Sequence, residues 1–122
     1  MNSRAYDVAG RILIGLLFLI SGLGKLAAPA SVMGYMSAMQ VPGVLLWPVI
    51  ALEVFGGMAL IAGFRQREAA FALAAFTIVA TLLFHRDFGN QIQLTIALKN
   101  IAIVGGLLMI ARPAPAFPQK SE

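Results

Sequence analysis

Apolar residues run through this chain in four long stretches, and polar residues gather between them. The stretches cover residues 6–26, 44–64, 68–84 and 92–110. At about 1.5 Å per residue, a helix of roughly 20 residues is as long as the ~30 Å hydrocarbon core of a bilayer is thick. The pattern therefore predicts an all-α membrane protein, a bundle of four transmembrane helices forming one domain over residues 1–112.

The two segments outside this pattern differ from each other in composition. Residues 27–43, AAPASVMGYMSAMQVPG, are too few and too polar for a span, but their methionines recur at helical spacing. We expect a short interfacial helix there, between the first and second spans. Residues 113–122 are polar and rich in proline, which predicts a disordered cytoplasmic tail.

The first stretch also fits a second interpretation. Its most apolar part, Ile12 to Gly24, is followed by Ala28-Pro29-Ala30, which is the order found in a secretory signal peptide. Lys25 interrupts the approach to such a cleavage site, and three further apolar stretches would anchor the chain in any case. We therefore treat this stretch as a span and keep cleavage as the alternative.

Composition excludes several classes of protein. Of the 122 residues, 60% are hydrophobic and 11% are charged, whereas about 25% are charged in soluble domains. The absence of cysteine excludes disulfides, thiolate metal sites and iron–sulfur ligation by this chain. The net charge is +4, but the basic residues stand singly at the ends of apolar runs. We therefore expect lipids and a membrane protein or a second copy as partners, and no nucleic acid.

The basic residues also predict an orientation in the membrane. The N-terminus, the connection between spans two and three, and the C-terminus carry Arg4, Arg11, Arg65, Arg67, Arg112 and Lys120. The other two connections have only Lys25 and Arg86 beside them. Because basic residues concentrate in cytoplasmic loops, both termini are expected on the cytoplasmic side of a bacterial inner membrane.

Three polar residues lie deep inside the apolar stretches. Glu53 is near the middle of the second, and Lys99 and Asn100 are well inside the fourth. Ionisable groups at membrane depth normally face the bundle interior and mark functional sites. Counting residues from the outer ends puts them at similar depth, which predicts one polar cluster with Lys25 and His85 at its mouth. The plainest interpretation is that Glu53 and Lys99 form an ion pair that only sets helix register.

The functional interpretation starts from the surplus of positive charge, because Lys25 and Lys99 outnumber Glu53. Such a cluster suits a quinone headgroup: Lys99, Asn100 and His85 can donate to carbonyl oxygens, and Glu53 or His85 can exchange protons. One histidine offers at most one histidine ligand to haem. We expect no metal site, because Glu53, His85 and Asp87 match no ligand spacing.

Four segments in order resemble the DoxX family of small four-helix membrane proteins. They are GLLFLISGLGKL after Arg11, EVFGG from Glu53 with ALIAGF behind it, ATLLFH ending at His85, and ALKNIAIVGG around Lys99. The resemblance extends from Arg11 to about Ile110. It implies a four-helix bundle in the bacterial inner membrane, linked to quinone-dependent redox, including a membrane subunit of thiosulfate:quinone oxidoreductase, or to oxidative-stress complexes. The resemblance does not imply a particular set of catalytic residues.

Three functions are compatible with these observations. The first is a quinone-linked redox subunit, which is a part of an oxidoreductase and not a complete enzyme. The second is a non-catalytic scaffold or partner subunit that uses the close-packing points expected at Gly56-Gly57 and Gly105-Gly106. The third is a transporter of a small solute or of protons, in which the polar cluster would gate a pathway.

Overall fold

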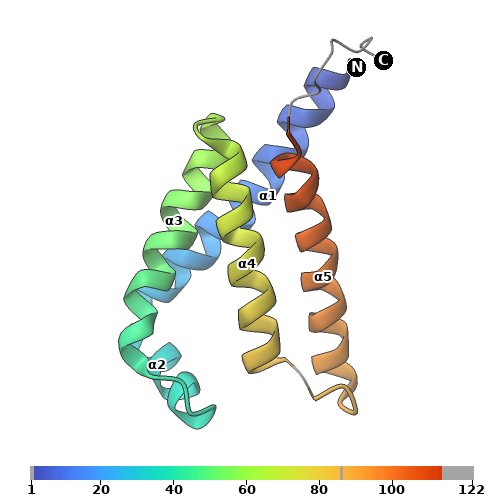
Figure 1. Ribbon diagram of the computed structural model, residues 1–122. Coiled ribbons are helices and arrows are strands. Elements are labelled where there is room, and N and C mark those ends of the chain that lie inside the picture. Colours follow the sequence, from blue (N-terminus) through green and yellow to red (C-terminus); the bar gives the residue numbers. More distant parts are fainter. Residues whose placement is uncertain (1, 86, 114–122) are drawn as a thin grey trace.

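The computed structural model describes residues 2–85 and 87–113, and its regular secondary structure is helical throughout them (Figure 1). The elements are α1 (Ser3–Ala27), α2 (Pro29–Ala38), the 3-10 turn η1 (Gly43–Leu45), α3 (Leu46–Ala62), α4 (Gln66–Phe84) and α5 (Gln91–Ala111). Four of these segments are long and apolar enough to cross a membrane, α3 being extended by η1. The predicted all-α fold with four spans is confirmed, and α2 occupies the place of the short helix. The predicted tail, after residue 113, lies outside the described residues.

The helix ends follow from local residue chemistry. Asn2 caps α1, since its Oδ1 accepts a hydrogen bond of 2.9 Å from the Ala5 amide, and Asn90 caps α5 in the same way. Pro29 opens α2 at a position where its missing amide costs no helical hydrogen bond. Gly63 ends α3 with φ of 75°, a left-handed conformation that favours glycine. These caps set the lengths of the spans.

The helices form two tightly packed pairs. Helix α1 packs chiefly against α3, and α4 packs chiefly against α5. The pairs join through α3 and α4, and less extensively through α1 and α5. The start of α1, the end of α5 and the α3–α4 turn lie at one end of the bundle, whereas α2 and the α4–α5 connection lie at the other (Figure 1). Helix α1 is thus an integral member of the bundle.

Glycines set the separation of α1 and α3. A Cβ atom on Gly57 would lie 2.7 Å from the carbonyl oxygen of Gly15 and 2.7 Å from the amide nitrogen of Leu19. A Cβ atom on Gly22 would lie 3.0 Å from the Cβ atom of Glu53. The backbones of the two helices therefore touch along a seam that begins at Gly15 and continues to Gly22.

The two glycine pairs predicted as close-packing points behave differently. Gly56 and Gly57 are buried and in close contact with neighbouring helices, as predicted. Gly105 has open space where its side chain would be, and a Cβ on Gly106 would meet only the Cδ1 atom of Ile14, at 2.8 Å. The prediction is wrong for Gly105, because α5 packs against α4 through another face and leaves Gly105 exposed.

Two apolar clusters stabilise the bundle, one toward each end. The larger surrounds the fully buried side chains of Leu60, Leu73 and Leu107. The smaller joins α2 to the start of α3 and includes Met36 and Leu46. The space between the two clusters is where the polar side chains of the spans gather.

We predict that Gly57→Ala lowers the stability of the bundle by roughly 1–3 kcal/mol, because the added methyl group would meet two backbone atoms that cannot rotate away. Gly105→Ala is the matched control, since it adds the same methyl group in open space within a helix. Thermal unfolding of both variants in one detergent measures the difference. Equal unfolding midpoints would contradict the close approach of α1 and α3.

Candidate functional site

An ion pair joins the two helices of the glycine seam. The Nζ atom of Lys25 on α1 lies 2.6 Å from Oε1 of Glu53 on α3. The hydroxyl of Ser21 donates a hydrogen bond of 2.8 Å to the other carboxylate oxygen, and Lys25 donates one of 2.8 Å to the Ser21 oxygen. Glu53 is only 3% exposed. Each of its oxygens therefore has a donor, as a buried carboxylate requires.

The local sequence explains why these three groups meet. Ser21 and Lys25 are four residues apart on α1, so they lie one above the other on the same helix face. Gly22 lies between them and lets α1 approach Glu53 closely. The seam thus places a serine and a lysine beside the carboxylate of Glu53, which is buried in the middle of α3.

The expected pairing of Glu53 with Lys99 is wrong. Glu53 pairs with Lys25, and Lys99 makes no hydrogen bond or ion pair with any residue that the structure describes. The reason is helix order: α3 packs against α1 and α4, whereas α5 packs against α4 and α1. Similar depth along two helices does not bring two side chains together when the helices are not neighbours.

The other predicted residues have partners between α4 and α5. Asn100 donates a hydrogen bond of 2.9 Å from Nδ2 to the hydroxyl oxygen of Thr81. The Nδ1 atom of His85 lies 3.0 Å from Oε1 of Gln93, which leaves the second ring nitrogen available. These contacts fasten the two helices near the end that carries their connection.

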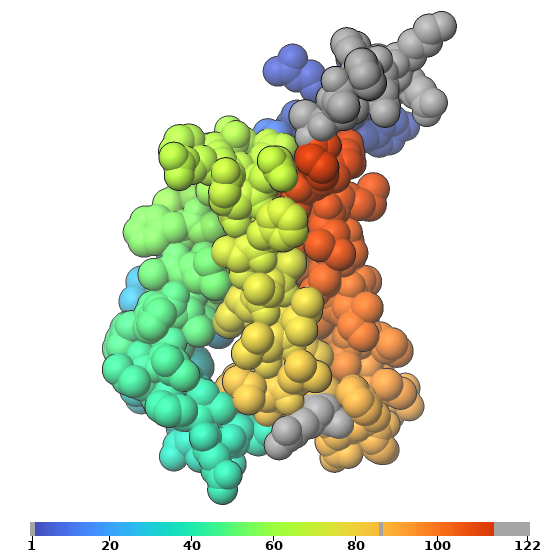
Figure 2. Space-filling model, in the orientation of Figure 1, coloured from blue at the N-terminus to red at the C-terminus, as the bar shows by residue number. Residues whose placement is uncertain are grey.

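All five predicted residues line one cavity, of about 350 Å³, although they do not form a single bonded cluster. They are Lys25, Glu53, His85, Lys99 and Asn100. The cavity lies between the two helix pairs and beside α2. In Figure 2 the molecule is hollowed at this level, between the green-blue start of α3 and the yellow lower part of α4.

The remaining walls of the cavity are apolar and aromatic. Phe18, Phe76 and Phe84 contribute rings, and Tyr35 of α2 stacks on Phe84 with ring centroids 5.4 Å apart. Three side chains that line the cavity carry a formal charge: Lys25 and Glu53 form an ion pair, and Lys99 has no counterion within the described residues. The cavity is therefore a mostly apolar space with hydrogen-bond donors and one uncompensated cation.

Sequence reasoning missed several partners of these residues. Ser21 was recognisable, because it lies one helical turn before Lys25. Thr81 and Gln93 had no comparable signal, since an isolated threonine or glutamine in a span is equally compatible with a packing role. Tyr35 depends on how α2 folds back over the bundle, which spacing does not reveal.

Comparisons with known proteins agree with this architecture. The DoxX family model matches residues 7–86. The chain is 40% identical to "Inner membrane protein YqjF" of Escherichia coli (strain K12) over 108 residues, which are 88% of this chain and 83% of that relative. No solved structure matches it. The relative's name and the four apolar helices together support a multi-pass inner-membrane location.

The family model covers more than half of the chain and includes Lys25, Glu53 and His85, and the relative is similar over most of its length. This chain therefore belongs to the DoxX family.

Proposed function

We propose that this protein is a quinone-linked membrane subunit of a redox or oxidative-stress system, and that the cavity between its helix pairs receives the quinone headgroup. The observation that supports the proposal is the position of Lys99, which lines the cavity and has no partner among the described residues. Because Lys25 already balances Glu53, Lys99 is available to polarise a carbonyl oxygen.

The shape and chemistry of the cavity suit such a headgroup. Its volume of about 350 Å³ lies in the range of small-molecule sites. Flat aromatic walls from Phe76 and Phe84 can pack against a ring, while Asn100 retains an amide hydrogen beyond the one given to Thr81. A carbonyl oxygen near Lys99 and Asn100 would meet two donors.

Reduction of a quinone to the quinol takes two electrons and two protons in total, and one proton is bound by each oxygen. His85 has a ring nitrogen that is not used by Gln93, and the Lys25–Ser21–Glu53 chain connects groups that can exchange protons. The electrons would come from a partner subunit that carries a redox centre. The chain would thus bind and protonate the headgroup as one part of an enzyme.

We further propose that both termini face the cytoplasm. The end of the bundle with the start of α1 and the α3–α4 turn carries Arg4, Arg11, Arg65, Arg67 and Arg112, whereas Lys25 and His85 lie toward the other end. The cavity would then lie in the outer half of the membrane.

Single cysteines test this orientation, because the natural chain has none. We expect a membrane-impermeant maleimide to label Gly89→Cys, in the α4–α5 connection, on intact spheroplasts. It should label Glu68→Cys, at the start of α4, only in inside-out vesicles. The reverse labelling would contradict cytoplasmic termini.

The central prediction concerns Lys99. We expect Lys99→Met to remove a quinone that co-purifies with the wild-type protein in mild detergent, because the substitution keeps the length of the side chain and removes its charge. Mass spectrometry of the extracted small molecules measures the loss. The thermal midpoint of the ligand-free protein should not fall, since Lys99 has no hydrogen bond or ion pair within the described residues that the substitution would break.

Thr95→Val is the matched control on the same helix. Thr95 is exposed, bonds to the carbonyl of Gln91 and does not line the cavity, so this variant should retain the quinone. Wild-type protein that carries no quinone, but co-purifies with another protein, would favour the scaffold function instead. If the Lys99→Met protein retained the quinone, the proposal that Lys99 binds the headgroup would be contradicted.

A second experiment separates the structural role of the ion pair from binding. Lys25→Met leaves the carboxylate of Glu53 buried and unpaired, and we expect it to cost about 3 kcal/mol of stability. Adding Glu53→Leu should restore much of that loss, because the unpaired charge is then gone. Thermal unfolding of the two single variants and the double variant in one detergent measures this coupling. Additive losses would show that the two residues are not energetically paired.

A further inference from the structure

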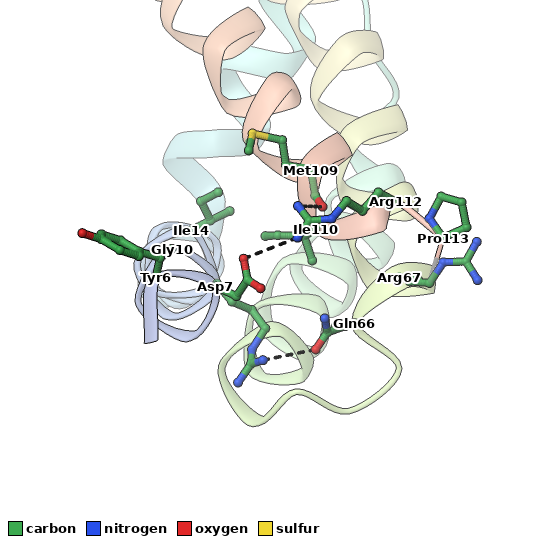
Figure 3. Close-up of a pocket in the computed structure, with 12 residues that line it drawn as sticks. Tyr6, Asp7, Gly10, Ile14, Gln66, Arg67, Met109, Ile110, Arg112 and Pro113 are labelled. Carbon is green, nitrogen blue, oxygen red and sulfur yellow. Dashed lines mark hydrogen bonds and ion pairs between the residues drawn. The ribbon is translucent and has the colours of Figure 1, made fainter. Parts of the chain in front are cut away.

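A second cavity, of about 520 Å³, lies at the end of the bundle that carries the α3–α4 turn. It is built where α1 and α5 meet over only a short stretch, and residues from the start of α4 form part of its rim (Figure 3). None of the five residues discussed above, Lys25, Glu53, His85, Lys99 and Asn100, lines this cavity, and the proposed quinone headgroup does not occupy it.

Three guanidinium groups line its polar side. Arg11 donates from Nε to the Leu60 carbonyl at 2.6 Å and from Nη1 to Gln66 at 3.2 Å. Arg67 donates from Nε to the carbonyl of Ala111 at 3.1 Å, and neither of its terminal nitrogens has a hydrogen-bond partner within the described residues. These bonds hold the arginines in place and leave hydrogen-bond donors over the cavity.

The third arginine contacts the only carboxylate on the lining. Arg112 lies 3.6 Å from Asp7 in an exposed ion pair and also donates to the carbonyl of Met109 at 3.1 Å (Figure 3). With Arg11, Arg67 and Arg112 against Asp7, the lining carries a formal charge of 3 − 1 = +2. An exposed ion pair of this length contributes little and is readily exchanged for a stronger anion.

The opposite wall is apolar and runs along the helices toward the membrane interior. Ile14 of α1 faces Met109 and Ile110 of α5, and Gly106 adds no side chain between them. A free anion has no apolar group that could pack against this wall. An amphiphile with a phosphate group and a hydrocarbon chain would use both sides of the cavity.

We propose that this cavity binds an anionic phospholipid, with its phosphate among Arg11, Arg67 and Arg112 and an acyl chain along the wall between α1 and α5. Planar guanidinium groups bind phosphate oxygens through paired hydrogen bonds, and basic pockets between helix ends hold lipid headgroups in this manner. Arg67 and Arg112 lie at the ends of spans, which is the depth of the headgroup region. Arg11 reaches the same end of the bundle through its bonds to Leu60 and Gln66.

The test is lipid binding to the purified full-length chain, measured by native mass spectrometry in a neutral detergent. Phosphatidylglycerol is compared with phosphatidylcholine of the same acyl chains and with glycerol phosphate, which has no acyl chain. We expect phosphatidylglycerol to bind about tenfold more tightly than either comparison ligand, the difference that one good charge-assisted contact provides.

The variants locate the binding. Arg67→Gln combined with Arg112→Gln should weaken phosphatidylglycerol binding about tenfold, while Arg67→Lys, which keeps the charge but not the planar fork, should weaken it less. Arg4→Gln combined with Arg65→Gln is the charge-matched control, because both arginines are exposed near the same end and neither lines the cavity.

Three results would overturn the proposal: equal binding of the two phospholipids, glycerol phosphate binding as tightly as phosphatidylglycerol, or equal effects of the Arg67→Gln/Arg112→Gln variant and the Arg4→Gln/Arg65→Gln control. The comparison of ligands on wild-type protein decides the matter even if the double variant fails to fold. Loss of quinone in Lys99→Met, with lipid binding unchanged, would show that the two sites are separate.

Discussion

The contact between Lys25 and Glu53 is the interaction on which the arrangement of this bundle depends. A carboxylate in the middle of a membrane span is tolerated only with a partner and a full set of hydrogen bonds, because the hydrocarbon around it cannot solvate charge. Lys25 and Ser21 supply both. They can reach Glu53 only if the backbones of α1 and α3 come nearly into contact, and the glycines at positions 15, 22 and 57 permit this approach. Pairing of the buried carboxylate therefore requires the close approach of α1 and α3 that the glycines permit.

The cavity is a consequence of that pairing. With α1 held against α3, and with α5 packed on α4, the cluster around Leu60, Leu73 and Leu107 fills part of the space between the pairs, whereas a cavity remains at the level of Glu53. Lys99 lines this space from α5 and has no carboxylate partner, since Glu53, the only carboxylate that lines the cavity, is paired with Lys25. An uncompensated lysine beside aromatic walls is expensive to maintain unless something binds it. This cost is the physical reason to regard the cavity as a site.

The two ends of the bundle differ in how they use positive charge. Toward α2, Lys25 and Lys99 line the cavity between the helix pairs, Lys25 bonded to Glu53 and Lys99 exposed. At the opposite end, the arginines bond to the last carbonyls of α3 and α5, at Leu60 and Ala111, where the partial negative charge of a helix end attracts them. Arginine suits this position because one nitrogen can hold the helix while others remain free for a further anion. A lysine side chain has a single nitrogen, so it is less suited to bond to a helix carbonyl and bind an anion at the same time.

The sequence by itself determined the class of this protein, its four spans, the short helix between the first two, and the set of five polar residues that line the cavity. Those features depend on local quantities: hydrophobic run length, helix caps, and the rarity of charge inside a span.

The sequence did not determine which polar residues pair with one another. Residue counting placed Glu53 and Lys99 at similar depth and led to the wrong ion pair, because depth is a coordinate along each helix while contact also depends on which helices are neighbours and how each is rotated. Gly57 and Gly105 have the same local signature, yet only Gly57 lies in a seam. Only the tertiary structure decided these points, because the packing of α1 on α3 and of α5 on α4 sets which faces of the helices meet.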